Sequence, residues 1–110
     1  MDTQTPDTFR AFVERFPEVW RAQEMGAKAT EQAGPLDRKT RELIKIGICL
    51  GGNLQTALRR HVHQALESGA SLAEIEQAII LGVNTVGFPA AMIAWKAARD
   101  QVREHEAVET

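Results

Sequence analysis

Residues 35–89 decide the fold, and they read PLDRKTRELIKIGICLGGNLQTALRRHVHQALESGASLAEIEQAIILGVNTVGFP. Two breakers divide this stretch into three runs: Gly51-Gly52-Asn53 ends the first run, and Gly69 ends the second. Within each run, apolar side chains recur every three or four residues, as they do along one face of a helix. The stretch therefore predicts three helices, and the short connection favours antiparallel packing of the first two.

Capping signals place the starts of these three helices. Asp37 is the expected cap of the first helix and Asn53 of the second. Ser71 and Glu74 form a capping box for the third helix, which we expect to continue to about Val86. The first helix is apolar around most of its girth over residues 43–50, which is typical of a buried helix.

Three further helices are expected outside this stretch. Pro17 separates two short helices near the amino terminus, and Thr5 is the expected cap of the first. An alanine-rich helix follows Pro89 and runs into Arg103, and the tail after Glu104 is expected to fray. The sequence therefore predicts an all-α, single-domain helical bundle of about six helices over residues 1–110.

Composition and charge narrow the class of protein. The chain has 110 residues, of which 44% are hydrophobic and 25% charged, and this is ordinary globular usage. The net charge of -2 gives no bulk attraction to nucleic acid or to an anionic membrane. Residues 86–92 would form the recognition helix of a helix-turn-helix, but they contain Pro89 and no base-reading side chain, so we reject nucleic-acid binding.

Several features favour the cytoplasm. No apolar stretch reaches the roughly 18 residues of a membrane-spanning helix. Residues 1–6 lack the basic and apolar parts of a signal peptide. The single cysteine, Cys49, cannot form an intrachain disulfide. We therefore expect a cytoplasmic protein.

Two titratable residues, Glu42 and His61, lie where their helices should be apolar. A buried imidazole without a hydrogen bond costs roughly 1–3 kcal/mol, so a polar group should lie opposite His61. Glu42 is the natural partner, since a carboxylate that faces the interior is also expensive unless it is paired. Two simpler interpretations stay open: a structural core histidine, and a solvated Glu42 beside Lys39 and Lys45, which the spacing alone favours.

The remaining polar residues of the second helix fall on its other side: Arg59, Arg60, His63, Gln64 and Glu67. A basic cluster combines Arg59 and Arg60 with four residues of the preceding helix: Arg38, Lys39, Arg41 and Lys45. By default it is a solvated surface, but if it rims the His61 pocket it could attract an anionic substrate. Cys49 is interpreted as a small buried hydrophobe. The three histidines and one cysteine form no recognisable ligand set, so we expect no metal and no other cofactor.

Three motifs together resemble the carboxymuconolactone decarboxylase family, which is related to the alkylhydroperoxidase D-like proteins. The likeness covers nearly the whole chain and is closest over residues 36–97, the expected core of the domain. It implies an all-helical fold around an antiparallel helical pair, and homo-oligomers that are often trimers or hexamers. The matching pieces are Asp37-x-Lys39-x-x-Glu42-Leu43-Ile44, His61-x-x-x-Ala65-Leu66-x-x-Gly69-Ala70 with Glu74-Ile75, and Gly87-x-Pro89.

One departure from that family bears on the chemistry. Peroxidase-type members carry a C-x-x-C that ends four residues before the histidine, and these positions are Leu54 and Ala57 here. The missing dithiol implies that peroxide reduction is absent too. Decarboxylase-type members also lack the cysteines and have a G-x-P segment, so the chain resembles that branch more closely. The resemblance implies that Glu42 and His61 are the relay residues.

Two classes of function follow from these observations. The first is a cofactor-independent lyase that performs acid–base chemistry on a small carboxylated or lactone-type molecule. In it, His61 moves the proton, Glu42 orients His61, and Arg59 or Arg60 attracts the anion. The second is a non-catalytic oligomeric family member; an alkylhydroperoxidase-like antioxidant protein is a further alternative. We also expect the apolar residues Ile79, Ile80 and Leu81 to form a subunit interface.

Overall fold

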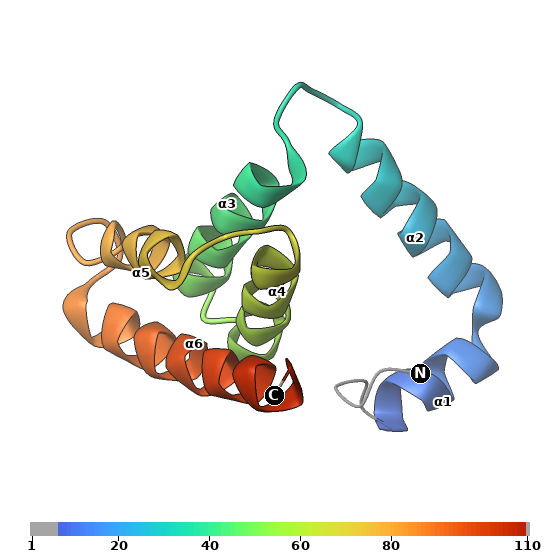
Figure 1. The fold of residues 1–110 in the computed structure, drawn as a ribbon. Coiled ribbons are helices and arrows are strands. Elements are labelled where there is room, and N and C mark those ends of the chain that lie inside the picture. Colours follow the sequence, from blue (N-terminus) through green and yellow to red (C-terminus); the bar gives the residue numbers. More distant parts are fainter. Residues whose placement is uncertain (1–6, 110) are drawn as a thin grey trace. The chain divides into compact units, whose positions relative to one another are not determined.

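The computed structural model describes residues 7–109, and in this range it contains six α-helices and no β-strand (Figure 1). The prediction of an all-helical fold is confirmed. The expected cap at Thr5 lies outside the described residues. The helices are α1 (Asp7–Arg15), α2 (Pro17–Glu31), α3 (Arg38–Gly51), α4 (Gln55–Glu67), α5 (Leu72–Ile80) and α6 (Phe88–Glu109).

Two compact units divide the chain, the first ending at Pro35 and the second beginning at Leu36. In the first unit, Phe9 of α1 and Trp20 of α2 meet edge to face with their ring centroids 4.8 Å apart. No residue of α1 or α2 is buried, so these two helices make aromatic contacts without enclosing a core. The prediction of one domain over residues 1–110 stays a prediction.

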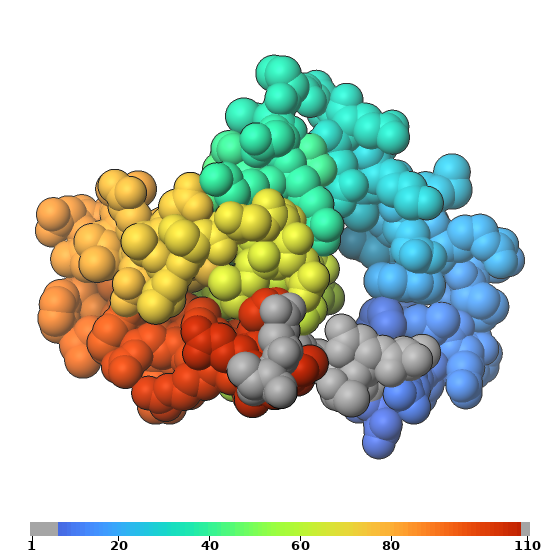
Figure 2. Space-filling model, in the orientation of Figure 1, coloured from blue at the N-terminus to red at the C-terminus, as the bar shows by residue number. Residues whose placement is uncertain are grey.

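The second unit holds the hydrophobic core. Helix α3 packs against α4 and α5, and α6 packs against α4 and α5. Side chains fill the spaces that the ribbon leaves open between α4, α5 and α6 (Figures 1 and 2). Five large side chains are almost wholly buried, and α6 adds mainly alanines, which let its backbone approach closely. The core residues include Ile46, Leu58, Val62, Ile75 and Ile79, with Ala91, Ala94 and Ala98 of α6.

A tight turn folds α3 and α4 into an antiparallel pair. The Leu54 N–H donates to the Cys49 carbonyl at 2.9 Å, and Asn53 has a left-handed backbone with φ of 57°. Asparagine tolerates this conformation better than most residues. Asn53 is therefore the reversing residue of the turn, and the prediction that it caps α4 is wrong: Leu54 holds that position.

Two helices end elsewhere than the sequence indicated. Helix α5 stops at Ile80, and residues 81–86 form turns that pack beside α3. A Cβ atom at Gly82 would lie 2.9 Å from Leu50 Cδ2, so a larger residue there would require the buried Leu50 side chain to shift. Helix α6 continues to Glu109, because its last turns pack on α4; Glu104, for example, pairs with Arg59.

Helix α3 carries apolar side chains on most of its surface, but only one side of the helix is buried. Ile46, Cys49 and Leu50 are buried, whereas Ile44 and Ile48 are 46% and 62% exposed. The expectation of a fully buried helix is therefore wrong for the single chain, which leaves an apolar face open. None of the helices in residues 7–109 has both the length and the apolar character required to cross a membrane.

Candidate functional site

The Glu42 and His61 side chains meet across the α3–α4 pair. Glu42 Oε2 lies 2.6 Å from His61 Nδ1, which is a short hydrogen bond. Glu42 is only 5% exposed, and the His61 side chain is 14% exposed. The predicted contact is confirmed, and the alternative of a solvated Glu42 is wrong. Lys45 remains a looser neighbour, with its Nζ 3.9 Å from Glu42 Oε1.

Local sequence explains why these two side chains face each other. Asp37 caps α3 by accepting a hydrogen bond from the Thr40 N–H at 2.8 Å. This bond holds the pKa of Asp37 below its ordinary value. With the start of α3 set there, Glu42 falls on the same face as Ile46 and points inward. On α4, His61 lies beside the buried Val62, and the antiparallel turn places it opposite Glu42.

Gln64 is a third member of the site that the sequence analysis assigned to the polar side of α4. Its amide group lies 3.1 and 3.2 Å from the two Glu42 carboxylate oxygens when the NH₂ group faces them. In this orientation both the NH₂ group and the carbonyl oxygen of the Gln64 amide face suitable hydrogen-bond partners, so it is the correct one. Gln64 follows His61 by three residues, and this helical spacing was the available signal. The carboxylate is therefore held from two positions on α4.

The hydrogen bond to Glu42 distinguishes the two ring nitrogens of His61. An ionised carboxylate only accepts hydrogen bonds, so the His61 Nδ1–H donates to Glu42 in this contact, and in the neutral form of that ring the lone pair lies on Nε2. No hydrogen bond within residues 7–109 engages Nε2. The Nε2 lone pair is therefore available to accept a proton from a small molecule that reaches the exposed edge of the ring.

Cys49 has the properties of an inert thiol. It is buried, and burial raises the pKa of its thiol; the Glu42 charge adds to this and the Arg60 charge opposes it. Leu54 and Ala57, which occupy the positions of the family's cysteine pair, lie at the amino terminus of α4. A helix amino terminus is where a thiolate would be stabilised, and here it carries two aliphatic side chains.

The two arginines expected to bind substrate differ in their surroundings. Arg59 turns toward α6, where its Nε donates to Gln101 Oε1 at 3.3 Å and its guanidinium pairs with Glu104 at 2.5 Å. Among the described residues, Arg59 contacts neither Glu42 nor His61. Arg60 is exposed, and its charge acts on the thiol of Cys49.

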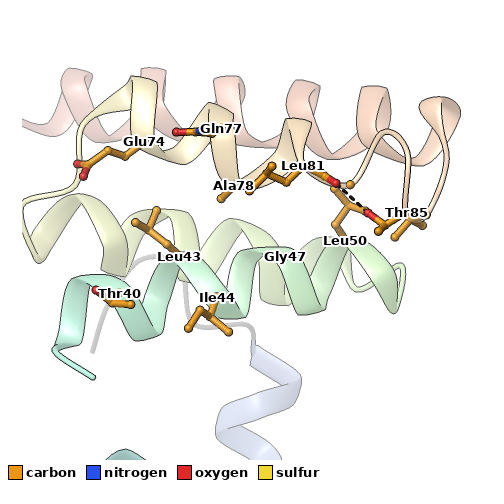
Figure 3. Close-up of a pocket in the computed structure, with 12 residues that line it drawn as sticks. Thr40, Leu43, Ile44, Gly47, Leu50, Glu74, Gln77, Ala78, Leu81 and Thr85 are labelled. Carbon is orange, nitrogen blue, oxygen red and sulfur yellow. Dashed lines mark hydrogen bonds between the residues drawn. The ribbon is translucent and has the colours of Figure 1, made fainter. Parts of the chain in front are cut away.

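Two surface grooves of the second unit leave the Glu42–His61 pair outside their linings. One, of about 470 Å³, lies between α3 and the α5 region, with Leu43, Ile44 and Leu81 among its mainly apolar walls (Figure 3). The other, of about 530 Å³, is lined by Arg59, Trp95 and other residues of α4 and α6. Of the two side chains, His61 is the more accessible, with 14% of its surface exposed against 6% for Glu42.

The fold and the site together define an all-helical protein with a carboxylate–imidazole pair buried across an antiparallel helix pair. The sequence model of the carboxymuconolactone decarboxylase family matches residues 14–100, which is most of the chain. The protein therefore belongs to the carboxymuconolactone decarboxylase family. A search of curated proteins found no match.

Proposed function

We propose that this protein is a cofactor-independent enzyme that moves a proton in a small carboxylated or lactone-type molecule. The observation that carries the proposal is the 2.6 Å hydrogen bond between Glu42 and His61 Nδ1, which leaves Nε2 of the imidazole without a hydrogen-bond partner among residues 7–109. The name of the matching family supports a reaction of the decarboxylase kind. An enzyme of this kind needs one group that gives and takes a proton at carbon.

The proton transfer follows from the chemistry of such acids. When a carboxylate leaves as CO₂, its electron pair passes to a carbon conjugated with the lactone carbonyl. Nε2 of His61, which has taken up a proton from water, delivers that proton to the carbon, so that one proton is consumed for each CO₂ released. In an isomerisation, Nε2 removes a proton at one carbon and delivers it at another.

Glu42 acts in this scheme as a positioning residue. Its carboxylate accepts the Nδ1–H bond, orients the ring, and stabilises the positive charge that forms on the imidazole. Gln64 holds the carboxylate in place through its amide. Because the pair is largely buried, this electrostatic stabilisation is stronger than it would be in water.

Arg60 is the better candidate for attracting the anionic substrate. It is exposed, and its charge acts on α3 at Cys49, on the face of the helix that also carries Glu42. Arg59 would first have to leave Glu104 and Gln101. Reversing the charge with Arg60→Glu should therefore raise KM more than Arg59→Glu does.

The test is a screen of muconolactone-type acids for CO₂ release and for isomerisation. We expect His61→Gln to lower turnover by about 10²–10⁴, the usual contribution of general acid–base catalysis, with the helical circular-dichroism spectrum unchanged. Glu42→Gln should lower kcat while KM stays close to that of the wild type. His63→Gln is the matched control on the same helix and should retain activity. Turnover that survives His61→Gln would overturn the mechanism.

A second candidate is a non-catalytic family member in which the pair only stabilises the fold. The observation that favours it is that neither groove described above includes Glu42 or His61 in its lining. In that case no acid in the screen is turned over by the wild type, and His61→Gln lowers only the thermal midpoint. Thiol-dependent peroxide reduction is not expected of either candidate, since burial raises the pKa of Cys49.

We also propose that the chain forms a homotrimer or homohexamer in the cytoplasm. The support is the apolar surface that a single chain leaves open: Ile48, Ile80 and Leu81 are 62%, 59% and 68% exposed. Ile79, which the sequence analysis placed at the interface, is fully buried in the core of the chain and cannot contact a second subunit. A stable monomer in sedimentation at micromolar concentration would contradict this proposal.

A further inference from the structure

Three side chains of α4 and α6 converge away from the Glu42–His61 pair. His63 and Glu67 are four residues apart on α4 and share one face of the helix. His105, on the last turns of α6, lies against them. One potential ligand atom from each of the three residues lies within 4.8 Å of the other two.

The spacing of these atoms is informative. Glu67 Oε1 is 3.9 Å from His63 Nε2 and 3.7 Å from His105 Nδ1. Both distances exceed the roughly 2.7–3.2 Å of a hydrogen bond. By contrast, two ligands at about 2.0–2.2 Å from one tetrahedral zinc ion lie about 3.4 Å apart. The three groups are therefore too far apart to bond to one another and close to the spacing of ligands around one ion.

His63 is left with unused bonding capacity. Its Nδ1 is buried and has no hydrogen-bond partner among the described residues. Its ring meets the His105 ring edge to face, with centroids 5.4 Å apart. With the proton of the neutral imidazole on the buried Nδ1, the lone pair lies on Nε2, the nitrogen 3.9 Å from Glu67 Oε1, and this is the atom that a cation would bind.

We propose that His63, Glu67 and His105 bind one divalent transition-metal ion, with zinc as the natural occupant. Two imidazoles and one carboxylate form a three-ligand set used for zinc, with a fourth position left for water. Imidazole nitrogen disfavours Mg²⁺ and Ca²⁺, which take oxygen ligands. Glu67 is about half exposed, which gives the ion a path from solvent.

The first test uses the untagged full-length protein after removal of metal with EDTA. We expect Co²⁺ to bind with a stoichiometry of one and to give the visible absorption of a tetrahedral cobalt site, and we expect Zn²⁺ to displace it. Zn²⁺ should also raise the thermal midpoint of the metal-free protein. These readouts do not depend on any enzymatic activity, so they are independent of the proposed function.

Variants locate the ion. His105→Gln and Glu67→Gln should each weaken Co²⁺ binding by at least about 10-fold, since losing even an outer-shell partner costs that much. Glu67 is half exposed, so its replacement keeps the fold intact, and circular dichroism verifies this for each variant. His61→Gln is the matched control and should retain the cobalt spectrum. The proposal is overturned if the wild type shows no cobalt absorption, if binding survives both His105→Gln and Glu67→Gln, or if His61→Gln alone abolishes it.

Discussion

His61 and His63 lie two residues apart on α4, yet their side chains differ in hydrogen bonding and in the helix that they face. His61 makes a 2.6 Å hydrogen bond to a carboxylate of α3 that a neighbouring amide also holds. His63 faces a carboxylate 3.9 Å away and has a buried nitrogen with no partner in the described part of the chain. The difference comes from the helix that packs against each face of α4. Helix α3 places Glu42 beside His61, and helix α6 places His105 beside His63. A histidine's role here is set by its neighbours rather than by its own helix.

The largest effect on stability should come from removing the imidazole of His61. His61→Leu leaves the buried Glu42 carboxylate without its nearest partner, and breaking a buried pair in this way costs about 3–5 kcal/mol. We expect the lower end of this range, because Gln64 remains beside the carboxylate. Urea unfolding of the metal-free protein, monitored by circular dichroism, measures the change.

The matched control is His63→Leu, which removes no hydrogen bond of the metal-free protein. His63 is half-buried and contacts the His105 ring, but its loss leaves no buried charge unpaired, so the free energy of unfolding should fall by less than in His61→Leu. Equal losses for the two variants would remove the contrast between the faces of α4.

Gln64 provides the next largest effect. Gln64→Leu removes the amide that faces Glu42, and leaving a buried acceptor with fewer partners costs about 1–3 kcal/mol. Gln55→Leu is the control, since Gln55 is exposed in the first turn of α4. If both variants unfold at the same urea concentration, the amide of Gln64 does not support the carboxylate.

The reactivity of Cys49 can be compared with that of a cysteine placed at position 54, at the start of α4. Burial raises the pKa of Cys49 above its ordinary value of 9.0, so at pH 8 less of it is thiolate than in a free thiol. Modification by a disulfide reagent should be slower in the folded than in the unfolded protein, because the raised pKa lowers the thiolate population and burial restricts access to the sulfur. In a Cys49→Ala background, Leu54→Cys at the exposed start of α4 should react fast. A native Cys49 that reacts as fast as Leu54→Cys would refute the inert assignment.

An exposed carboxylate gives the smallest effect and serves as the reference for Glu42. The Ser71 N–H bonds to Glu74 at 2.9 Å and Lys39 pairs with it at 3.0 Å, and these contacts hold the pKa of Glu74 below its ordinary value of 4.5. A carboxyl whose pKa is lowered by folding stabilises the folded state above the unfolded pKa and loses this contribution as pH falls. Glu74→Gln should therefore lower the thermal midpoint slightly at pH 7, and the difference from the wild type should shrink below pH 4.5. A difference that grows on acidification would contradict the assignment.

Local signals in the sequence determined the helices and most of their starts. Asp37 caps α3, and Ser71 with Glu74 forms the capping box of α5, both as predicted. These signals act over three or four residues, so they can be read without knowing the rest of the fold. The Glu42–His61 contact could be predicted as well, because both groups interrupt apolar faces and the short turn brings their helices together.

Only the tertiary structure decided which surfaces meet. Gln64 appeared to belong to the polar side of α4, and Arg59 could not be assigned to Glu104 of α6. The tail after Glu104 appeared frayed, yet packing against α4 extends the helix and places His105 beside His63. Such contacts join residues of different helices, from 22 positions apart for Glu42 and Gln64 to 45 for Arg59 and Glu104, and they depend on the rotation and approach of whole helices. Helical periodicity identifies the faces of each helix, whereas the packing of all four helices of the second unit determines what each face contacts.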